Sequence, residues 1–107
     1  MTPYLQITTT TSTREEANCI AAALVERRLA ACVQVAGPIT SLYRWEGQIE
    51  TAHEWLCIIK TTREKYGDVE AAIRELHSYE MPEMVGTEIV VGSEGYLGWV
   101  AEQTQSE

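Results

Sequence analysis

The chain has 107 residues, of which 45% are hydrophobic, enough for one modest core in a single domain. Sixteen acidic residues against eight basic ones give a formal net charge of −8, which argues against a nucleic-acid partner because phosphate binding needs a basic footprint. No apolar run approaches the length of a membrane span, and residues 1–4 show no leader pattern, so we expect a cytoplasmic protein without a membrane partner.

The three cysteines, Cys19, Cys32 and Cys57, are widely spaced and odd in number. They form no CxxC pair of the kind found in zinc sites or redox motifs. Because cysteine is among the most buried residue types, we expect buried thiols.

The first predicted elements are a strand over 4–10 and a helix. The strand alternates apolar and polar residues and is rich in threonine. Ser12 and Glu15 have the spacing of a capping box, and the helix is expected to end near Arg27 and Arg28. Its apolar face has helical spacing and comprises Ala17, Ile20, Ala21, Leu24 and Val25.

A long β-hairpin is predicted next, with arms over 32–45 and 49–61 joined by a turn at Glu46 and Gly47. The dipeptide Gly37-Pro38 should produce a bulge or bend. An arm of this length reaches roughly 45 Å at about 3.3 Å per residue, whereas a domain of about 100 residues is only some 35 Å across. We therefore expect the hairpin tip to dock on another copy of the chain.

A second reason to expect a partner copy is the segment 55–59, which is apolar on both faces of its strand. Such a strand needs a cover on each side. The predicted helices supply one cover, so a second subunit is expected to supply the other.

The remaining predicted elements complete an α+β fold. Thr61 or Thr62 is expected to cap a second helix, whose buried stripe is Tyr66, Val69, Ile73 and Leu76. A loop over 77–83, a strand over 85–91, a closing helix capped by Ser93 and a polar tail over 103–107 follow. The order βαββαβ plus a C-terminal helix predicts one ferredoxin-like domain over residues 1–107.

Several sequence blocks then resemble a known family. Residues 30–33 (AACV), 40–47 (TSLYRWEG), 59–62 (IKTT), 79–83 (YEMPE) and 96–99 (YLGW) are similar to blocks of the CutA divalent-cation tolerance family. The resemblance covers nearly the whole chain. It implies a homotrimer of ferredoxin-like subunits with PII-like architecture, a response to metal ions and copper binding. Tyr43, Trp45 and Trp55 are the expected interface residues.

The metal ligands that the resemblance implies are only partly present here. Copper-binding members carry a cysteine at the position of Thr9 and a His-His pair at the positions of Leu76 and His77. Neither Thr9 nor Leu76 is a copper ligand. We therefore expect Cu²⁺ or another divalent cation to bind weakly, with His77 and Cys32 as the candidate ligands.

Lys60 ends an apolar strand, where a lysine must extend to solvent or meet an anionic partner. The resemblance places Lys60, His77, Tyr79 and Glu83 around an inter-subunit cleft. These side chains could hold a carboxylate or a phosphate. The alternative is a structural ion pair between Lys60 and Glu83 across the subunit boundary.

The favoured function is therefore a trimeric tolerance protein that binds metal ions or a small anionic metabolite in clefts between subunits. The alternative is a PII-like regulatory protein that senses a metabolite with no direct metal role. An enzyme is not expected, because the sequence offers no set of nucleophile, base and orienting group. A metallochaperone and an RNA-binding module are disfavoured by the missing CxxC and RNP motifs.

Overall fold

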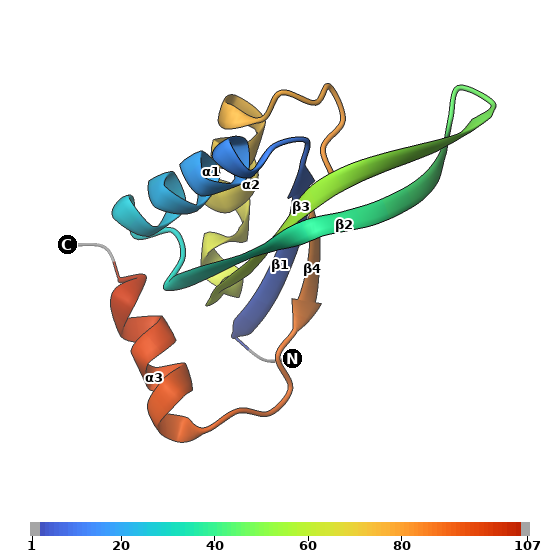
Figure 1. Cartoon of the computed structure of the whole chain (residues 1–107). Helices are drawn as coiled ribbons and strands as arrows, with labels where there is room; N and C mark the ends of the chain where they lie inside the picture. Colours follow the sequence, from blue (N-terminus) through green and yellow to red (C-terminus); the bar gives the residue numbers. More distant parts are fainter. Residues whose placement is uncertain (1–2, 106–107) are drawn as a thin grey trace.

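The computed structural model describes residues 3–105, and it has the predicted ferredoxin-like order of elements with a C-terminal helix (Figure 1). The elements run β1 (Tyr4–Thr11), α1 (Arg14–Glu26), β2 (Cys32–Trp45), β3 (Gln48–Thr62), the 3₁₀ turn η1 (Arg63–Lys65), α2 (Tyr66–Leu76), β4 (Val85–Glu88) and α3 (Glu94–Gln103). None of the helices in this described part of the chain is long and apolar enough to span a membrane.

The four strands form one antiparallel sheet in the order β2-β3-β1-β4. The β2–β3 hairpin extends well beyond the two-layer body, and the molecule measures 44 × 25 × 22 Å (Figure 1). The expected irregularity is present, because the β2–β3 register shifts between Ala36 and Ile39. The turn also lies where predicted, with Glu46 and Gly47 both at positive φ.

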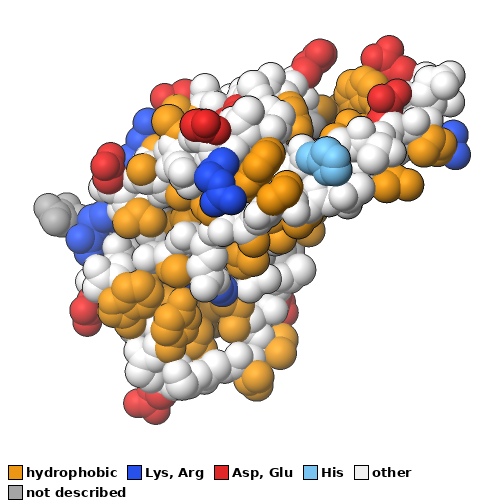
Figure 2. Space-filling view, in the orientation of Figure 1, with side chains coloured by type: hydrophobic (Ala, Val, Ile, Leu, Met, Phe, Trp, Pro, Cys, Tyr) orange, Lys and Arg blue, Asp and Glu red, His pale blue; other side chains and the backbone are white. Residues whose placement is uncertain are grey.

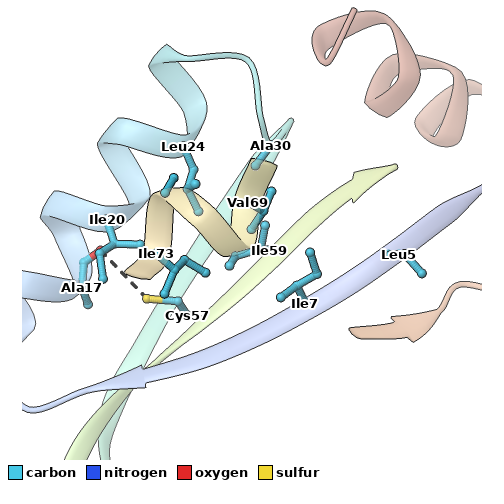
Figure 3. Packing of buried hydrophobic residues seen from close by; sticks show 11 residues of the cluster. Leu5, Ile7, Ala17, Ile20, Leu24, Ala30, Cys57, Ile59, Val69 and Ile73 are labelled. Carbon is cyan, nitrogen blue, oxygen red and sulfur yellow. Dashed lines mark hydrogen bonds between the residues drawn. The ribbon is translucent and has the colours of Figure 1, made fainter. Parts of the chain in front are cut away.

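The hydrophobic core lies between one face of the sheet and the two helices α1 and α2, which both cover that face (Figure 3). Alternate residues of β1 and β3 point into it, as the two-residue period of a strand requires. The buried cluster consists of Leu5, Ile7, Ala17, Ile20, Leu24, Ala30, Cys57, Ile59, Val69, Ala72 and Ile73. Both predicted helical stripes therefore face the core, although Val25 at the edge of the first is exposed.

The opposite face of the sheet is only partly covered. Leu56 and Ile58 are half-buried there, and α3 packs at the end of the sheet where Tyr96 lies beside Cys32. In Figure 2, hydrophobic side chains gather over α3 and recur along the hairpin. The exposed large hydrophobic residues of the hairpin are Leu42, Tyr43, Trp45 and Ile49.

Two predicted helix caps need correction. The N-cap of α1 is Thr13 rather than Ser12, because Thr13 Oγ1 accepts from Glu16 N at 3.1 Å. The two overlapping Ser/Thr-x-x-Glu patterns were equivalent in sequence. At α2, Thr62 makes no side-chain cap bond and flanks the 3₁₀ turn instead.

The last strand is also shorter than predicted, ending at Glu88 rather than at residue 91. Its partner strand β1 begins at Tyr4, whose carbonyl oxygen accepts a hydrogen bond from Ile89 N. Residues 90 and 91 therefore lie beyond the end of β1 and do not pair with it. At the C-terminus, Gln103 still belongs to α3 and Thr104 Oγ1 donates to Val100 O. The expected tail therefore starts later, and its residues 106–107 lie outside the described part.

Candidate functional site

A cleft of about 640 Å³ lies between the hairpin and the loop that follows α2. The hairpin contributes aromatic and apolar side chains from β2 and one carboxylate from β3, and the loop contributes a phenol and two carboxylates. The lining residues are Thr10, Thr40, Ser41, Leu42, Tyr43, Trp45, Glu54, Tyr79, Glu80, Met81 and Glu83.

The contact that joins the two walls of this cleft is a hydrogen bond from Tyr79 to Glu54. Tyr79 Oη donates to Glu54 Oε2 at 2.7 Å, and Glu54 is only 6% exposed. Burial, and then the hydrogen bond to the Glu54 carboxylate, raise the pKa of Tyr79 above its usual value. The phenol therefore stays neutral and keeps donating its proton to the carboxylate.

His77 holds the start of the loop against the end of β1. Its side chain is fully buried, with Nε2 2.7 Å from Thr10 O, while Nδ1 accepts from Tyr79 N at 3.0 Å. These partners assign the proton to Nε2, since a carbonyl only accepts and an amide only donates. The His77 and Tyr79 rings also lie 4.7 Å apart between centroids.

Glu16 fixes the same loop from the side of α1. Its carboxylate accepts from Ser78 N at 2.6 Å and from Ser78 Oγ at 3.1 Å. The positions of His77 and Tyr79 are thus set by three elements, β1, β3 and α1.

The four predicted ligand-binding residues do not converge within one subunit. His77 and Tyr79 lie together, and Glu83 lines the cleft while accepting from Thr8 Oγ1 at 3.2 Å. Lys60 instead donates to Gln34 Oε1 at 2.9 Å, and it lies on β3 roughly 20 Å from Glu54 at about 3.3 Å per residue. The Lys60–Glu83 ion pair considered above would join two subunits, so it stays a prediction.

The candidate metal ligands are also separated. Cys32 is half-buried at the start of β2, and both ring nitrogens of His77 are engaged in hydrogen bonds. Thr9 is fully buried and its Oγ1 has no hydrogen-bond partner. Across residues 3–105, no three His, Cys, Asp or Glu side chains are grouped to hold a metal ion, so a tight copper site does not fit one subunit.

Of the three predicted interface residues, Tyr43 and Trp45 line the cleft and remain 44% and 43% exposed. Trp55 behaves differently, because its ring packs against the core of its own subunit. An added Cβ at Gly37 would lie 2.6 Å from Trp55 Cδ1, which explains why a glycine stands at the bulge.

Glu54 lines the cleft but is not among the site residues predicted from the sequence. Its only sequence signal was a carboxylate directly before an apolar strand segment, which is common at a solvated hairpin edge. Glu54 is hydrogen-bonded to Tyr79, which lies on the loop after α2 and is 25 positions away in the sequence.

The fold and the cleft define a class of protein, the ferredoxin-like subunit with a protruding hairpin. Two solved structures match it closely. The divalent cation tolerance protein Cut A1 from Thermus thermophilus has a TM-score of 0.94 and 38% identity, covering 95% of this chain and 99% of that one. The periplasmic divalent cation tolerance protein CutA from Archaeoglobus fulgidus has a TM-score of 0.92 and 38% identity, with the same coverage.

The sequence comparisons agree with the structural ones. The family model described as CutA1 divalent ion tolerance protein matches residues 5–103. The divalent-cation tolerance protein CutA of Thermus thermophilus is 41% identical over 95 residues, which are 89% of this chain and 92% of the relative. The chain belongs to the CutA1 divalent ion tolerance family. Because one relative is named as periplasmic, the cytoplasmic location stays a prediction.

Proposed function

We propose that this chain acts, without catalysing a reaction, as a homotrimer in the response to divalent metal ions. The family name supports the link to divalent cations. The observation that carries the assembly is the hairpin, which protrudes from the body and exposes Leu42, Trp45 and Ile49 near its tip. Exposed apolar side chains on a bare two-stranded ribbon need a partner surface, because such ribbons are marginal in water.

The negative charge of the cleft supports weak binding of metal cations. Glu54, Glu80 and Glu83 line it, and among the described residues no Lys or Arg does. Carboxylates attract divalent cations, but a tight site needs several ligands at fixed distances. We infer that metal ions are held with low affinity at the cleft, where a neighbouring subunit could add further ligands.

The alternative is a PII-like regulatory role in which a small anionic metabolite binds near Lys60 between subunits. It is less well supported, because Lys60 lies far from the cleft of its own subunit. Thermal-shift measurements with small anionic metabolites distinguish the two roles. Stabilisation of the wild type that disappears in Lys60→Ala would favour the regulatory role.

The assembly is tested by light scattering at micromolar concentration, where we expect about three times the subunit mass of 12.0 kDa. Trp45→Ala should weaken the trimer by about 2 kcal/mol or more, because aromatic anchors dominate interfaces. Val25→Ala removes an exposed apolar side chain from α1 and is the control. A monomeric wild type, or equal assembly of both variants, would contradict the proposal.

The metal binding is tested by calorimetric titration with Cu²⁺. We expect no submicromolar site per chain, since the described subunit groups no three ligands. Any weaker copper binding that involves His77 should be lost in His77→Ala. A tight stoichiometric site that survives His77→Ala would contradict the proposal and direct attention to Cys32 or to the cleft carboxylates.

A further inference from the structure

We propose that Arg28 is a latch that holds helix α3 against the body of the subunit, and that α3 opens as a unit when this latch is removed. The latch consists of the two hydrogen bonds that the Arg28 guanidinium donates to the C-terminal end of α3. Helix α3 lies at the end of the body opposite the hairpin tip (Figure 1). The inference is therefore independent of the cleft at the hairpin and of the proposed response to metal ions.

The first support is the path of the Arg28 side chain. Its Nε donates to Gln105 O at 2.9 Å, and its Nη2 donates to Glu102 O at 3.1 Å. Glu102 belongs to the last turn of α3, and Gln105 directly follows the C-cap of that helix. Both acceptors therefore lie at the negative end of the helix dipole, where a cation is stabilising. The guanidinium thus ties α3 to a turn that lies 74 positions earlier in the chain.

The second support is the backbone conformation of Arg28. Its φ is 59°, in the left-handed region that favours glycine. The turn that ends α1 needs this conformation, because Leu29 N donates back to Leu24 O at 2.9 Å and Arg28 N donates to Val25 O at 3.1 Å. A glycine would adopt it without the steric cost of a Cβ. An arginine keeps that cost, and strain of this kind points to a role for the side chain.

The neighbouring Arg27 shows that a positive charge at this turn does not by itself make the latch. Its Nη1 donates to Glu75 Oε1 of α2 at 3.4 Å, and both of these side chains are largely exposed. Neither arginine lies in the last turn of α1. The two adjacent cations therefore serve two different helices, and Arg27 offers a control of equal charge.

The third support is the way in which α3 is attached to the rest of the subunit. The helix lies outside the core cluster between the sheet and the helices α1 and α2. Its buried residues, Val100 and the C-cap Thr104, lie towards the end that Arg28 holds, whereas Tyr96 and Trp99 nearer its start are exposed. Residues 89–93, which lead into α3, belong to no strand or helix. An element with so few buried apolar side chains opens locally more easily than the core.

Opening of α3 would uncover the start of β2. Tyr96 of α3 lies beside Cys32, and the Cys32 thiol is half-buried there. The rate at which Cys32 reacts with a thiol reagent therefore reports whether α3 is closed. Exchange of the α3 amides reports the same opening directly, because a closed helix protects its amides.

The test is hydrogen exchange read by peptide mass spectrometry on the wild type, Arg28→Gly and Arg27→Ala. All three are compared at a concentration where light scattering shows the same assembly. Glycine suits the backbone at position 28, so Arg28→Gly removes the latch without straining the turn. We expect peptides from α3 to exchange at least about tenfold faster in Arg28→Gly, because two hydrogen bonds from a charged donor are lost. Peptides from α1 and β1 should exchange as in the wild type.

Iodoacetamide should also alkylate Cys32 several-fold faster in Arg28→Gly. Arg27→Ala removes the same charge and should leave both α3 exchange and Cys32 alkylation unchanged. The proposal is overturned if α3 exchange in Arg28→Gly stays within about twofold of the wild type, if α1 and β1 accelerate equally, or if Arg27→Ala has the same effect. Unchanged alkylation of Cys32 overturns the assignment of α3 as its cover. Should Arg28→Gly fail to fold by circular dichroism, Arg28→Asn replaces it, because asparagine also tolerates the left-handed region.

Discussion

The Tyr79–Glu54 hydrogen bond should be a measurable source of stability, because it joins the loop to the hairpin over a buried carboxylate. Tyr79→Phe removes only the hydroxyl group and leaves Glu54 Oε2 without its donor at 2.7 Å. A hydrogen bond to a charged group contributes about 1.5–3 kcal/mol. We expect Tyr79→Phe to lower the free energy of unfolding by an amount in that range.

The assay is urea denaturation of the wild type, Tyr79→Phe, Glu54→Gln and the double variant. All four are measured at one protein concentration, because assembly couples to stability. The double-mutant cycle isolates the pair, and we expect a coupling energy of about 1–2 kcal/mol. A coupling energy below about 0.5 kcal/mol would refute the assignment of this bond as the link between the two walls.

The pH dependence gives an independent check on the same bond. The folded pKa of Tyr79 lies above its usual value of 10.0, so the contribution of the neutral phenol is complete below that pH. It is lost as the pH rises further and the phenol ionises. The difference in stability between the wild type and Tyr79→Phe should therefore be constant below pH 10.0 and shrink above it. If the difference in stability between the wild type and Tyr79→Phe stays constant above pH 10.0 as well, the raised pKa of Tyr79 is wrong.

The remaining predictions concern two glycines and one thiol. Gly37→Ala should destabilise the fold by about 1–3 kcal/mol, because the new Cβ would lie 2.6 Å from Trp55 Cδ1. A Cβ added at Gly67 in helix α2 would have no atom within 4 Å, so Gly67→Ala should stabilise the fold by about 0.5–1 kcal/mol. Equal effects of the two substitutions in urea denaturation would contradict this contrast. Burial, and to a lesser extent the charge of Glu16, raise the pKa of the Cys57 thiol to about 11. At pH 8 iodoacetamide should therefore alkylate exposed Cys19 much faster than Cys57 in the folded protein, as read by peptide mass spectrometry; similar rates would show the burial to be wrong. The same shift makes the Cys57 contribution to stability decline as the pH rises from 9.0 towards 11.

The candidate site could be predicted from the sequence only in part. The sequence places His77 and Tyr79 on a loop with a proline after a clear helical stripe, but only the family resemblance assigned them to a cleft. Lys60 was grouped with them only through the family resemblance, and within one subunit it lies elsewhere on β3. Whether a neighbouring copy brings Lys60 to the cleft stays a prediction.

The sequence by itself determined the elements of this protein, because their signals are local. A two-residue period produces β1, a 3.6-residue period produces the buried faces of α1 and α2, and the residues at 37–38 and 46–47 produce the bulge and turn of the hairpin. The hairpin also outreaches the body by its length alone. All of these follow from residues close together in the chain.

Only the tertiary structure decided which polar groups meet. His77 reaches a carbonyl 67 positions away on β1, and Tyr79 reaches Glu54 across 25 positions. Such contacts depend on strand register and on the path of a loop, and a shift of one residue in the register of β3 would turn Glu54 to the other face of the sheet. Propensity and periodicity carry no information on either quantity, so the buried carboxylate that defines the cleft became visible only in the folded chain.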